Sequence, residues 1–361
     1  MKTIKKITFI GPVPPPLGGV AVVNISFQKL KYDNATVTFF NTSNHQVREN
    51  LYSRFSLKNS WLELKKAVAL KKFITRHQPD LIHIFITSGY AIVRDILFLK
   101  IISTYKIPVV IHFHSKTAGE FALKPALLKI IGRLFNTYAA KIVLLSETHL
   151  LFFKKYFPAH KCLIIENFVD YSNYNCEIAQ KSNSFLYVGR LTKEKGFYDL
   201  LDALLIAKKE IKDIKVNVIG LADTDENERK ISAFIIANDL SENIILHGAK
   251  FDSEKYKLFK NCFCLIFPSH FENSPVVLKE AIAAKMALIA SDIKANTAIL
   301  KKSGNYLLFE TKNFKQLAAQ ITSLYHNQIM AGELMHASSK ILEYDSAFAI
   351  KKMNQLTTEL C

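Results

Sequence analysis

Residues 272–280 read Glu-Asn-Ser-Pro-Val-Val-Leu-Lys-Glu and directly follow Pro-Ser-His-Phe at residues 268–271. Two carboxylates, Glu272 and Glu280, stand eight residues apart, the first in a polar turn and the second in an apolar-patterned helix. Pro275 suits the first turn of that helix, where a missing N–H costs nothing. A helix start presents unpaired amides and a partial positive charge, and carboxylates accept hydrogen bonds from paired sugar hydroxyls. The stretch therefore indicates a site that holds a sugar nucleotide.

Both halves of the chain alternate short apolar runs with amphipathic helical stretches, which is typical of parallel sheets with helices on both faces. The predicted strands are residues 4–10, 37–41, 81–86, 109–113, 141–145, 162–165, 184–188, 215–219, 244–247, 263–267, 287–290 and 306–309. The predicted helices include residues 20–30, 62–77, 198–209, 255–261, 276–284 and 314–327. The polar segment Asp170–Asn183 lies between the halves, and we expect it to be a linker.

The composition is that of a globular protein with two domains of ordinary size, since the chain has 361 residues, of which 49% are hydrophobic and 22% charged. No stretch approaches the ~20 uninterrupted apolar residues of a membrane span. The apolar run near the start is ended by Gly11 and a proline cluster, so it predicts a first strand rather than a signal peptide. Five scattered cysteines form neither a metal-ligand spacing nor a disulfide framework, and we expect a cytoplasmic protein.

The positive charge is concentrated in the first half of the chain. Residues 1–166 hold 24 Lys and Arg against 8 Asp and Glu, whereas the remainder holds 24 against 23. The asymmetry indicates an anionic partner for the first half. Around Trp61 and Leu62 lie Arg54, Lys58, Lys65, Lys66, Lys71, Lys72 and Arg76. This segment is either a soluble helix with charged outer positions or a helix on an anionic membrane surface, and we favour the membrane, at the inner face of the cell membrane.

Residues 272–280 resemble the E-x7-E motif of the retaining glycosyltransferases of family 4, the group 1 type, which have the two-domain GT-B fold. Further matches follow in the order of that family: Phe9–Pro12 with Leu17–Val20, Pro79–Ile84, Pro108–Val110 with His112–Ser115, Ile164–Asp170, and Phe185–Leu191 with Lys195–Phe197. The resemblance covers almost the whole chain. It implies two Rossmann-like domains facing across a cleft: an acceptor-binding domain of residues 1–168 and a nucleotide-sugar-binding domain of residues 184–343. It also implies that residues 344–361 return to the first domain.

Arg190 and Lys195 flank a turn between a buried strand and a helix, where two cations suit a diphosphate with developing negative charge. The resemblance assigns them that role, and the alternative is a pair of solvated surface charges. It also implies that Glu280 accepts the ribose hydroxyls and that Glu272 contacts the donor sugar. Asn273, Ser274 and Pro275 complete the expected donor site, although the family often has glycine where this chain has Asn273. The alternative for both carboxylates is a capping or exposed position on a helix.

Three further motifs bear on the chemistry. Gly18 and Gly19 let the backbone approach a phosphate, or else form a tight turn, and a Rossmann G-x-G-x-x-G is absent. His114 ends a strand and by resemblance lies near the reacting centre, the alternative being a buried core histidine. We expect His112 to face the other side of that strand and to be structural. Asp223-Thr224-Asp225 mimics the D-x-D of metal-dependent transferases, but we interpret it as a solvated turn and expect no metal or other cofactor.

Together these features predict a retaining transferase that moves a hexose from a nucleotide diphosphate sugar to a lipid-linked or polysaccharide acceptor. The resemblance suggests a UDP-sugar and the assembly of capsule, lipopolysaccharide or another bacterial surface glycan. Two alternatives remain. A GT-B-like sugar-nucleotide epimerase would act without an acceptor, and the net charge of +17 suits a nucleic-acid-binding protein. The basic excess is rich in lysine and carries no recognition motif, so we expect no nucleic-acid partner.

Overall fold

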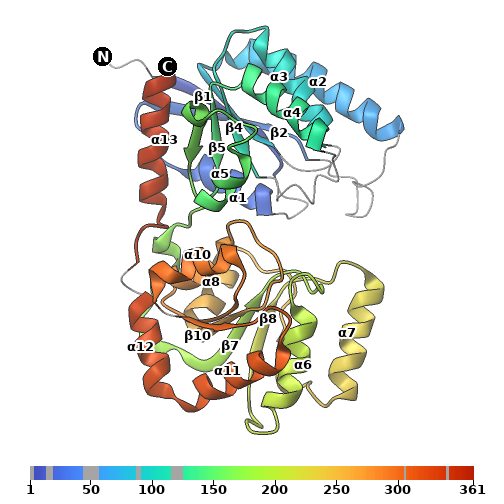
Figure 1. The fold of residues 1–361 in the computed structure, drawn as a ribbon, viewed down its shortest axis with the longest axis vertical. Helices are drawn as coiled ribbons and strands as arrows, with labels where there is room; N and C mark the ends of the chain where they lie inside the picture. Colours follow the sequence, from blue (N-terminus) through green and yellow to red (C-terminus); the bar gives the residue numbers. More distant parts are fainter. Residues whose placement is uncertain are drawn as a thin grey trace. The chain divides into compact units, whose positions relative to one another are not determined.

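The computed structural model describes residues 4–13, 19–43, 57–86, 91–114, 125–304, 306–338 and 341–361, with the side chains of 57–60 and 125–127 excepted. The chain forms two compact units (Figure 1). The first comprises the residues up to Phe168 together with Ser346–Cys361, and the second comprises Val169–Asp345. Among the described residues, no helix combines the length and apolar character needed to cross a bilayer.

The first unit is built on a six-stranded parallel sheet in the order β2-β1-β3-β4-β5-β6. Its strands are β1 (Lys5–Gly11), β2 (Ala35–Asn41), β3 (Leu81–Ile86), β4 (Val109–Phe113), β5 (Lys141–Leu144) and β6 (Cys162–Ile164). Its helices are α1 (Gly19–Lys29), α2 (Leu57–His77), α3 (Ala91–Ser103), α4 (Pro125–Tyr138), α5 (Glu147–Phe153) and α13 (Ser346–Leu360). Every residue of β3 and β4 is buried, as in the centre of a sheet that is covered on both faces.

The last helix of the chain, α13, belongs to this first unit (Figure 1). Polar side-chain contacts join it to the rest of the unit. Glu359 of α13 forms an ion pair of 2.7 Å with Lys141 of β5. The side-chain amide of Asn354 donates to a carboxylate oxygen of Asp33 at 2.9 Å. The chain therefore leaves the first unit after Phe168 and returns to it at Ser346.

The second unit has a six-stranded parallel sheet in the order β12-β11-β10-β7-β8-β9. Its strands are β7 (Ser182–Val188), β8 (Val216–Ile219), β9 (Ile244–Leu246), β10 (Cys262–Phe267), β11 (Ala287–Ser291) and β12 (Tyr306–Phe309). Its helices are α6 (Phe197–Ala207), α7 (Asp225–Ala237), α8 (Asp252–Asn261), α9 (Val276–Ala283), α10 (Lys294–Ser303), α11 (Phe314–His326) and α12 (Gln328–Ser338). The strand order reverses between β7 and β10, and ligands of such sheets bind where the loops diverge at a reversal of this kind.

These two sheets confirm the predicted α/β class, and each of the twelve predicted strands is present with its ends within two residues. The expected linker is wrong in one respect. Asp170–Asn183 belongs to the second unit, where it forms the short helices η3 (Tyr171–Tyr174) and η4 (Ile178–Gln180). Tyr174 is buried, with 3% of its surface exposed.

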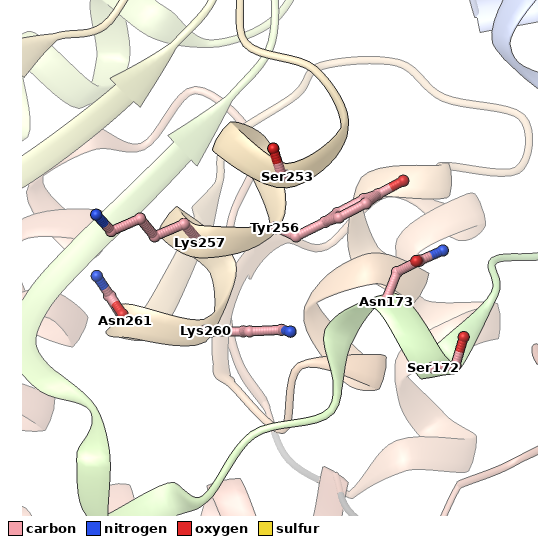
Figure 2. Close-up of a pocket in the computed structure, with 7 residues that line it drawn as sticks. All are labelled: Ser172, Asn173, Ser253, Tyr256, Lys257, Lys260 and Asn261. Atoms are coloured by element: carbon pink, nitrogen blue, oxygen red, sulfur yellow. The ribbon is translucent and has the colours of Figure 1, made fainter.

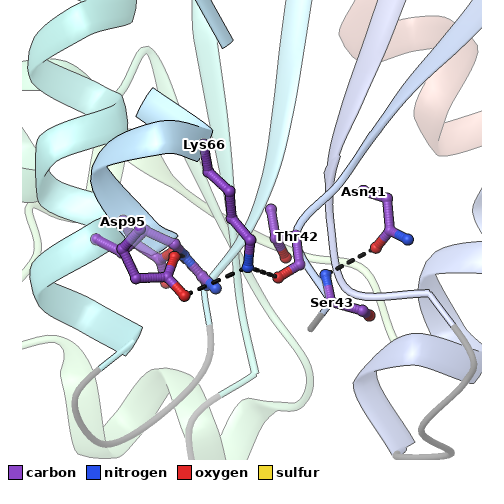
Figure 3. A network of polar contacts seen from close by, with 7 residues as sticks. Asn41, Thr42, Ser43, Lys66 and Asp95 are labelled. Atoms are coloured by element: carbon purple, nitrogen blue, oxygen red, sulfur yellow. Dashed lines mark hydrogen bonds and ion pairs between the residues drawn. The ribbon is translucent and has the colours of Figure 1, made fainter. Parts of the chain in front are cut away.

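A polar network fixes α2 against the end of β2 (Figure 3). The Lys66 ammonium donates to the carbonyl oxygen of Thr42 at 2.7 Å and pairs with Glu63 at 3.3 Å. Arg94 of α3 pairs with the buried Asp95 at 2.7 Å. Burial lowers the pKa of Lys66. Lys66, one of the basic residues that the sequence places around Trp61, therefore points into the unit, and the opposite face of α2 is turned to solvent.

Candidate functional site

The candidate site lies at the reversal point of the second sheet, where the loop after β7 meets the loop after β10. Gly196 begins α6 with a left-handed backbone, φ +69°, and an added Cβ there would lie 2.0 Å from the carbonyl oxygen of Pro268. Glycine is therefore required for the two loops to approach so closely. The backbone N–H of His270 donates to the carbonyl oxygen of Glu194 at 2.9 Å, which joins the loops directly.

A second link between these loops runs through side chains. His270 Nε2 lies 2.6 Å from a carboxylate oxygen of Asp199 in the first turn of α6. Beneath the first loop, the Tyr187 hydroxyl lies 2.8 Å from the carbonyl oxygen of Arg190 and 3.3 Å from that of Lys195, and it donates to them. Burial holds the pKa of Tyr187 well above its usual value, so the hydroxyl stays protonated as a donor. These contacts hold the turn from residue 190 to 195 in one conformation.

The two loops bring together residues that the sequence named from separate motifs. The Lys195 ammonium lies 2.5 Å from Glu272 Oε1, which also accepts a hydrogen bond of 2.9 Å from the Ser269 hydroxyl. The Glu272 side chain is 14% exposed, so a ligand can reach it. Arg190 is exposed at the start of the same turn as Lys195. A lysine, an arginine and a carboxylate at one sheet edge offer both signs of charge to a sugar diphosphate.

Glu280 lies in α9, the helix that follows the second loop. The Lys255 ammonium contacts both of its carboxylate oxygens, at 2.6 and 2.8 Å, and the Tyr174 hydroxyl donates to Oε1 at 2.6 Å. Asn273 and Ser274 belong to the loop before α9, and Pro275 caps the helix one residue before its first turn, where the sequence had placed it inside. The backbone of Pro275 is extended, φ −66° and ψ 112°.

The residues named in the first unit are placed as follows. His114 directly follows β4 and is buried, with 9% of its surface exposed. Among the described residues, no partner bonds its Nε2, and burial lowers its pKa to about 3, so the imidazole is neutral near pH 7. Gly19 begins α1 and is exposed, whereas Gly18 lies outside the described residues. The roles expected of these residues stay predictions.

The expectation that His112 faces the other side of the strand from His114 is wrong, whereas a structural role agrees with its burial. Its ring is nearly parallel to that of His114, with an angle of 11° and a centroid distance of 6.4 Å, because residues two apart on a strand share a face. His112 Nε2 lies 2.9 Å from Nδ1 of His83 on the neighbouring strand, and both rings are fully buried. Burial lowers the pKa of His83 to about 3 and that of His112 well below its usual value. Both are therefore neutral groups of the core.

The D-x-D sequence begins a helix rather than a free turn. Thr224 caps α7, because its hydroxyl accepts from the backbone N–H of Asn227 at 3.1 Å. Asp225 is the first residue of that helix, and Asp223 bonds the side chain of Asn227. These carboxylates therefore stabilise a helix N-terminus. In the described part of the chain, His, Cys, Asp and Glu form no cluster of three or more that could hold a metal ion.

Sequence reasoning missed four residues of this site: Tyr174, Lys255, Asp199 and Ser269. Tyr174 stood in the supposed linker, and Lys255 looked like one of many lysines on an amphipathic helix. Asp199 pairs with His270, which is 71 residues away in the sequence. Ser269 is only three residues from its partner Glu272, but a serine beside a motif carries no signal of its own. The order of the strands, which brings β7 beside β10, was the missing information.

Comparisons with known proteins identify the family to which this site and fold belong. Residues 26–173 match the family described as Glycosyltransferase Family 4, and residues 175–340 match Glycosyl transferases group 1. The capsular polysaccharide biosynthesis glycosyltransferase CapH of Staphylococcus aureus is 32% identical over 175 residues, which are 48% of this chain and 47% of that protein. The N-acetylgalactosamine-N,N'-diacetylbacillosaminyl-diphospho-undecaprenol 4-alpha-N-acetylgalactosaminyltransferase of Campylobacter jejuni is 31% identical over 158 residues, 42% of this chain and 41% of that protein. The match thus spans less than half the length of either relative.

Among solved structures, HepE of Anabaena in complex with UDP and glucose has a TM-score of 0.76 at 16% identity, covering 98% of this chain and 100% of that chain. The sucrose-phosphate synthase of Thermosynechococcus elongatus has a TM-score of 0.73 at 15% identity, covering 99% of both chains. Two units with parallel sheets and this shared architecture define the GT-B fold of glycosyltransferases. The chain belongs to glycosyltransferase family 4, the group 1 type, as the motif resemblance predicted.

A substitution at Gly196 tests whether the contact between the two loops maintains the site. Gly196→Ala should lower the unfolding free energy by about 2 kcal/mol or more, from left-handed strain and the clash with Pro268. It should also weaken nucleotide binding, because the turn from Arg190 to Lys195 is displaced. Thermal unfolding and isothermal titration calorimetry with UDP measure the two effects.

The matched control is Gly304→Ala, since Gly304 has a similar φ of +65° and, its chain neighbours aside, no atom of the described residues lies within 4 Å of an added Cβ. It should cost about 1 kcal/mol from left-handed strain alone and leave UDP affinity unchanged. Equal effects of the two substitutions on stability and on UDP affinity would contradict a special role for Gly196.

Proposed function

We propose that the protein is a retaining hexosyltransferase that transfers a sugar from a UDP-sugar to a lipid-linked or polysaccharide acceptor in bacterial surface glycan synthesis. The observation that carries the proposal is the contact between Lys195 and Glu272, with Arg190 on the same turn, at the reversal point of the second sheet. Cations for a diphosphate and a carboxylate for a sugar thus stand side by side. A sugar nucleotide needs both.

Several relatives support this choice of substrates. The Staphylococcus relative is named for capsular polysaccharide biosynthesis, and the name of the Campylobacter relative describes a sugar acceptor carried on diphospho-undecaprenol. HepE was solved with UDP and glucose, which favours uridine as the base. The proposed acceptor is accordingly a glycan on a lipid diphosphate, and nucleic acid is not among the proposed partners.

The proposed mechanism assigns one task to each group. Arg190 and Lys195 stabilise the departing diphosphate as the glycosidic bond breaks. Glu272 orients the sugar through its hydroxyls, after Lys195 turns from this carboxylate to the phosphate. The acceptor hydroxyl attacks from the face of the leaving group, whose phosphate oxygen takes its proton. His114 lines the reacting centre as a neutral group, since burial lowers its pKa to about 3.

We also propose that the first unit binds an anionic membrane at the inner face of the cell membrane, through the outer faces of α2, α3 and α4. These faces expose large apolar side chains: Trp61, Leu64, Val68, Val93, Leu97 and Ile130. Exposed cations surround them: Lys65, Lys71, Lys72, Arg76, Lys100, Lys129 and Arg133. We call this set the basic face.

The charge of the basic face is unopposed at the surface of the described helices. Glu63 and Asp95 are the acids of these three helices, and their side chains are 26% and 1% exposed and paired with Lys66 and Arg94. The Lys65 ammonium lies 3.4 Å from the centre of the Trp61 ring, so an apolar ring and a cation reach the surface together. Exposed apolar groups ringed by lysine suit the interface of an anionic bilayer.

The transfer proposal is tested at Lys195 and Glu272. Lys195→Ala and Glu272→Gln should each lower kcat/KM with a UDP-hexose and a lipid-linked acceptor by about 100-fold, since each removes a charge from the transition state. Lys193→Ala, an exposed lysine of the same loop, is the control and should stay within about twofold of the wild type. Undiminished transfer by both site variants would refute the assignment. An altered free sugar nucleotide made from donor alone would instead indicate an isomerase.

We propose that transfer needs no metal ion, because Arg190 and Lys195 supply the positive charge that a metal would otherwise bring to the diphosphate. Incubation with excess EDTA followed by gel filtration should leave the rate of sugar transfer within about twofold of the untreated protein. Loss of activity that returns on addition of Mg²⁺ or Mn²⁺ would contradict this part of the proposal.

Tryptophan fluorescence reports membrane binding at one known position, because Trp61 is the only tryptophan in the sequence. Its fluorescence should shift to shorter wavelength with vesicles containing phosphatidylglycerol and stay unchanged with pure phosphatidylcholine. Replacing Lys65, Lys72 and Lys129 by Gln should weaken vesicle binding about 100-fold, from about 1 kcal/mol per lysine. Replacing Lys209, Lys212 and Lys301 of the second unit removes the same charge and should have little effect. Equal shifts with both kinds of vesicle would contradict the proposal.

A further inference from the structure

The carboxylate of Glu280 is almost fully engaged by the protein itself. Lys255 contacts both oxygens, at 2.6 and 2.8 Å, and the Tyr174 hydroxyl donates to Oε1 at 2.6 Å. Glu280 is 5% exposed and Tyr174 is 3% exposed, whereas the Lys255 side chain is 18% exposed. A ligand arriving from solvent therefore meets Lys255 before it reaches Glu280.

A count of hydrogen bonds shows what this arrangement requires of a ligand. A carboxylate has about four lone-pair positions, and Lys255 and Tyr174 occupy three of them at Glu280. The 2′- and 3′-hydroxyls of a ribose present two donors side by side. Both can bond this carboxylate only when Lys255 gives up one of its two contacts.

Lys255 and Glu280 lie where a ligand can bind, and not at a structural ion pair remote from the site. Lys255 lies in the first turn of α8, which begins after the loop that follows β9. Glu280 lies in the second turn of α9, which begins after the loop that carries Glu272. Both helices start at the sheet edge where parallel sheets bind ligands.

We propose that Lys255 is a positioning residue for the nucleotide. Without a bound sugar nucleotide, Lys255 contacts both carboxylate oxygens of Glu280. When a donor binds, the ribose replaces one of the two contacts of Lys255, and Lys255 keeps its contact with the other oxygen, which holds the carboxylate aimed at the ribose. This inference rests on the proposed function, in which Glu280 accepts the ribose hydroxyls. It implies that Lys255 sets how strongly the protein distinguishes a ribonucleotide from one that lacks the cis-diol.

The physical reason is the cost of leaving Glu280 without a cation. Without Lys255 the buried carboxylate keeps one described side-chain partner, the Tyr174 hydroxyl, and no cation offsets the cost of its buried charge. Its two oxygens are then no longer held in the orientation that presents them to a ribose. A chain without Lys255 should therefore gain little from the two ribose hydroxyls.

Lys257 of the same helix is a suitable control. It is exposed and lines a hollow with Lys260, Tyr256 and Ser172, of which Lys255 is not a part (Figure 2). Lys257→Met thus removes one ammonium from α8 without touching Glu280. Any general effect of charge or helix stability appears in both variants, and an effect on the carboxylate appears in Lys255→Met alone.

The experiment is isothermal titration calorimetry with UDP and 2′,3′-dideoxy-UDP. Wild type and Lys257→Met should bind UDP at least about tenfold more tightly than the dideoxy compound. For Lys255→Met the ratio should fall below about threefold, and Lys255→Arg should restore most of it. Lys255→Gln should lower the affinity ratio as much as Lys255→Met. It is used in its place if Lys255→Met does not fold. A purely structural bridge would weaken both ligands equally and leave the ratio unchanged.

Glu280→Gln separates this inference from the proposed function. If it lowers the ratio and Lys255→Met does not, Glu280 reads the ribose without Lys255, and the inference is wrong. If Glu280→Gln also keeps the wild-type ratio, the ribose does not bind Glu280, and the assignment of this residue in the proposed function fails. If both lower the ratio and Lys257→Met does not, the inference is supported.

Discussion

The donor site depends on one close backbone contact, between Gly196 and Pro268. A side chain at residue 196 would place a carbon 2.0 Å from the Pro268 carbonyl oxygen, so the loops after β7 and β10 can meet only because that position is glycine. A second close backbone contact lies after the neighbouring strand β8. There a Cβ on Gly220 would lie 1.8 Å from the carbonyl oxygen of Gly189. Both contacts act on the turn that carries Arg190 and Lys195. Backbone geometry thus determines where the cations stand.

Two ion pairs hold the carboxylates of the donor site in place. Each carboxylate of the E-x7-E motif is held by a lysine from another element: Glu272 by Lys195, and Glu280 by Lys255. A buried carboxylate without such a partner is costly, so each lysine stabilises the carboxylate that it contacts. The pairs also keep the site nearly neutral in the absence of ligand, so that a sugar diphosphate exchanges partners with existing ion pairs and does not have to create them.

The sequence predicted the repeating pattern of the fold well, because central strands such as β3 and β4 are continuous apolar runs with clear ends. It also located Lys195 and Glu272, whose motifs carry local signals. It failed where function depends on long-range contacts. Tyr174 meets Glu280 only after η3 packs against α9, and Lys255 meets it only after α8 and α9 pack around β10. No local pattern reports these contacts. The inward direction of Lys66 could not be predicted either, because its partner Thr42 follows β2, a different part of the chain.

In the proposed mechanism Arg190 and Lys195 bind the diphosphate, which leaves Glu272 for the sugar. A crystal structure of the protein with UDP bound tests it most directly. We predict a β-phosphate within hydrogen-bond distance of Arg190 and Lys195, with the Lys195 ammonium more than 4 Å from Glu272, beyond the reach of an ion pair. A nucleotide bound elsewhere, with the Lys195–Glu272 pair intact, would contradict the account.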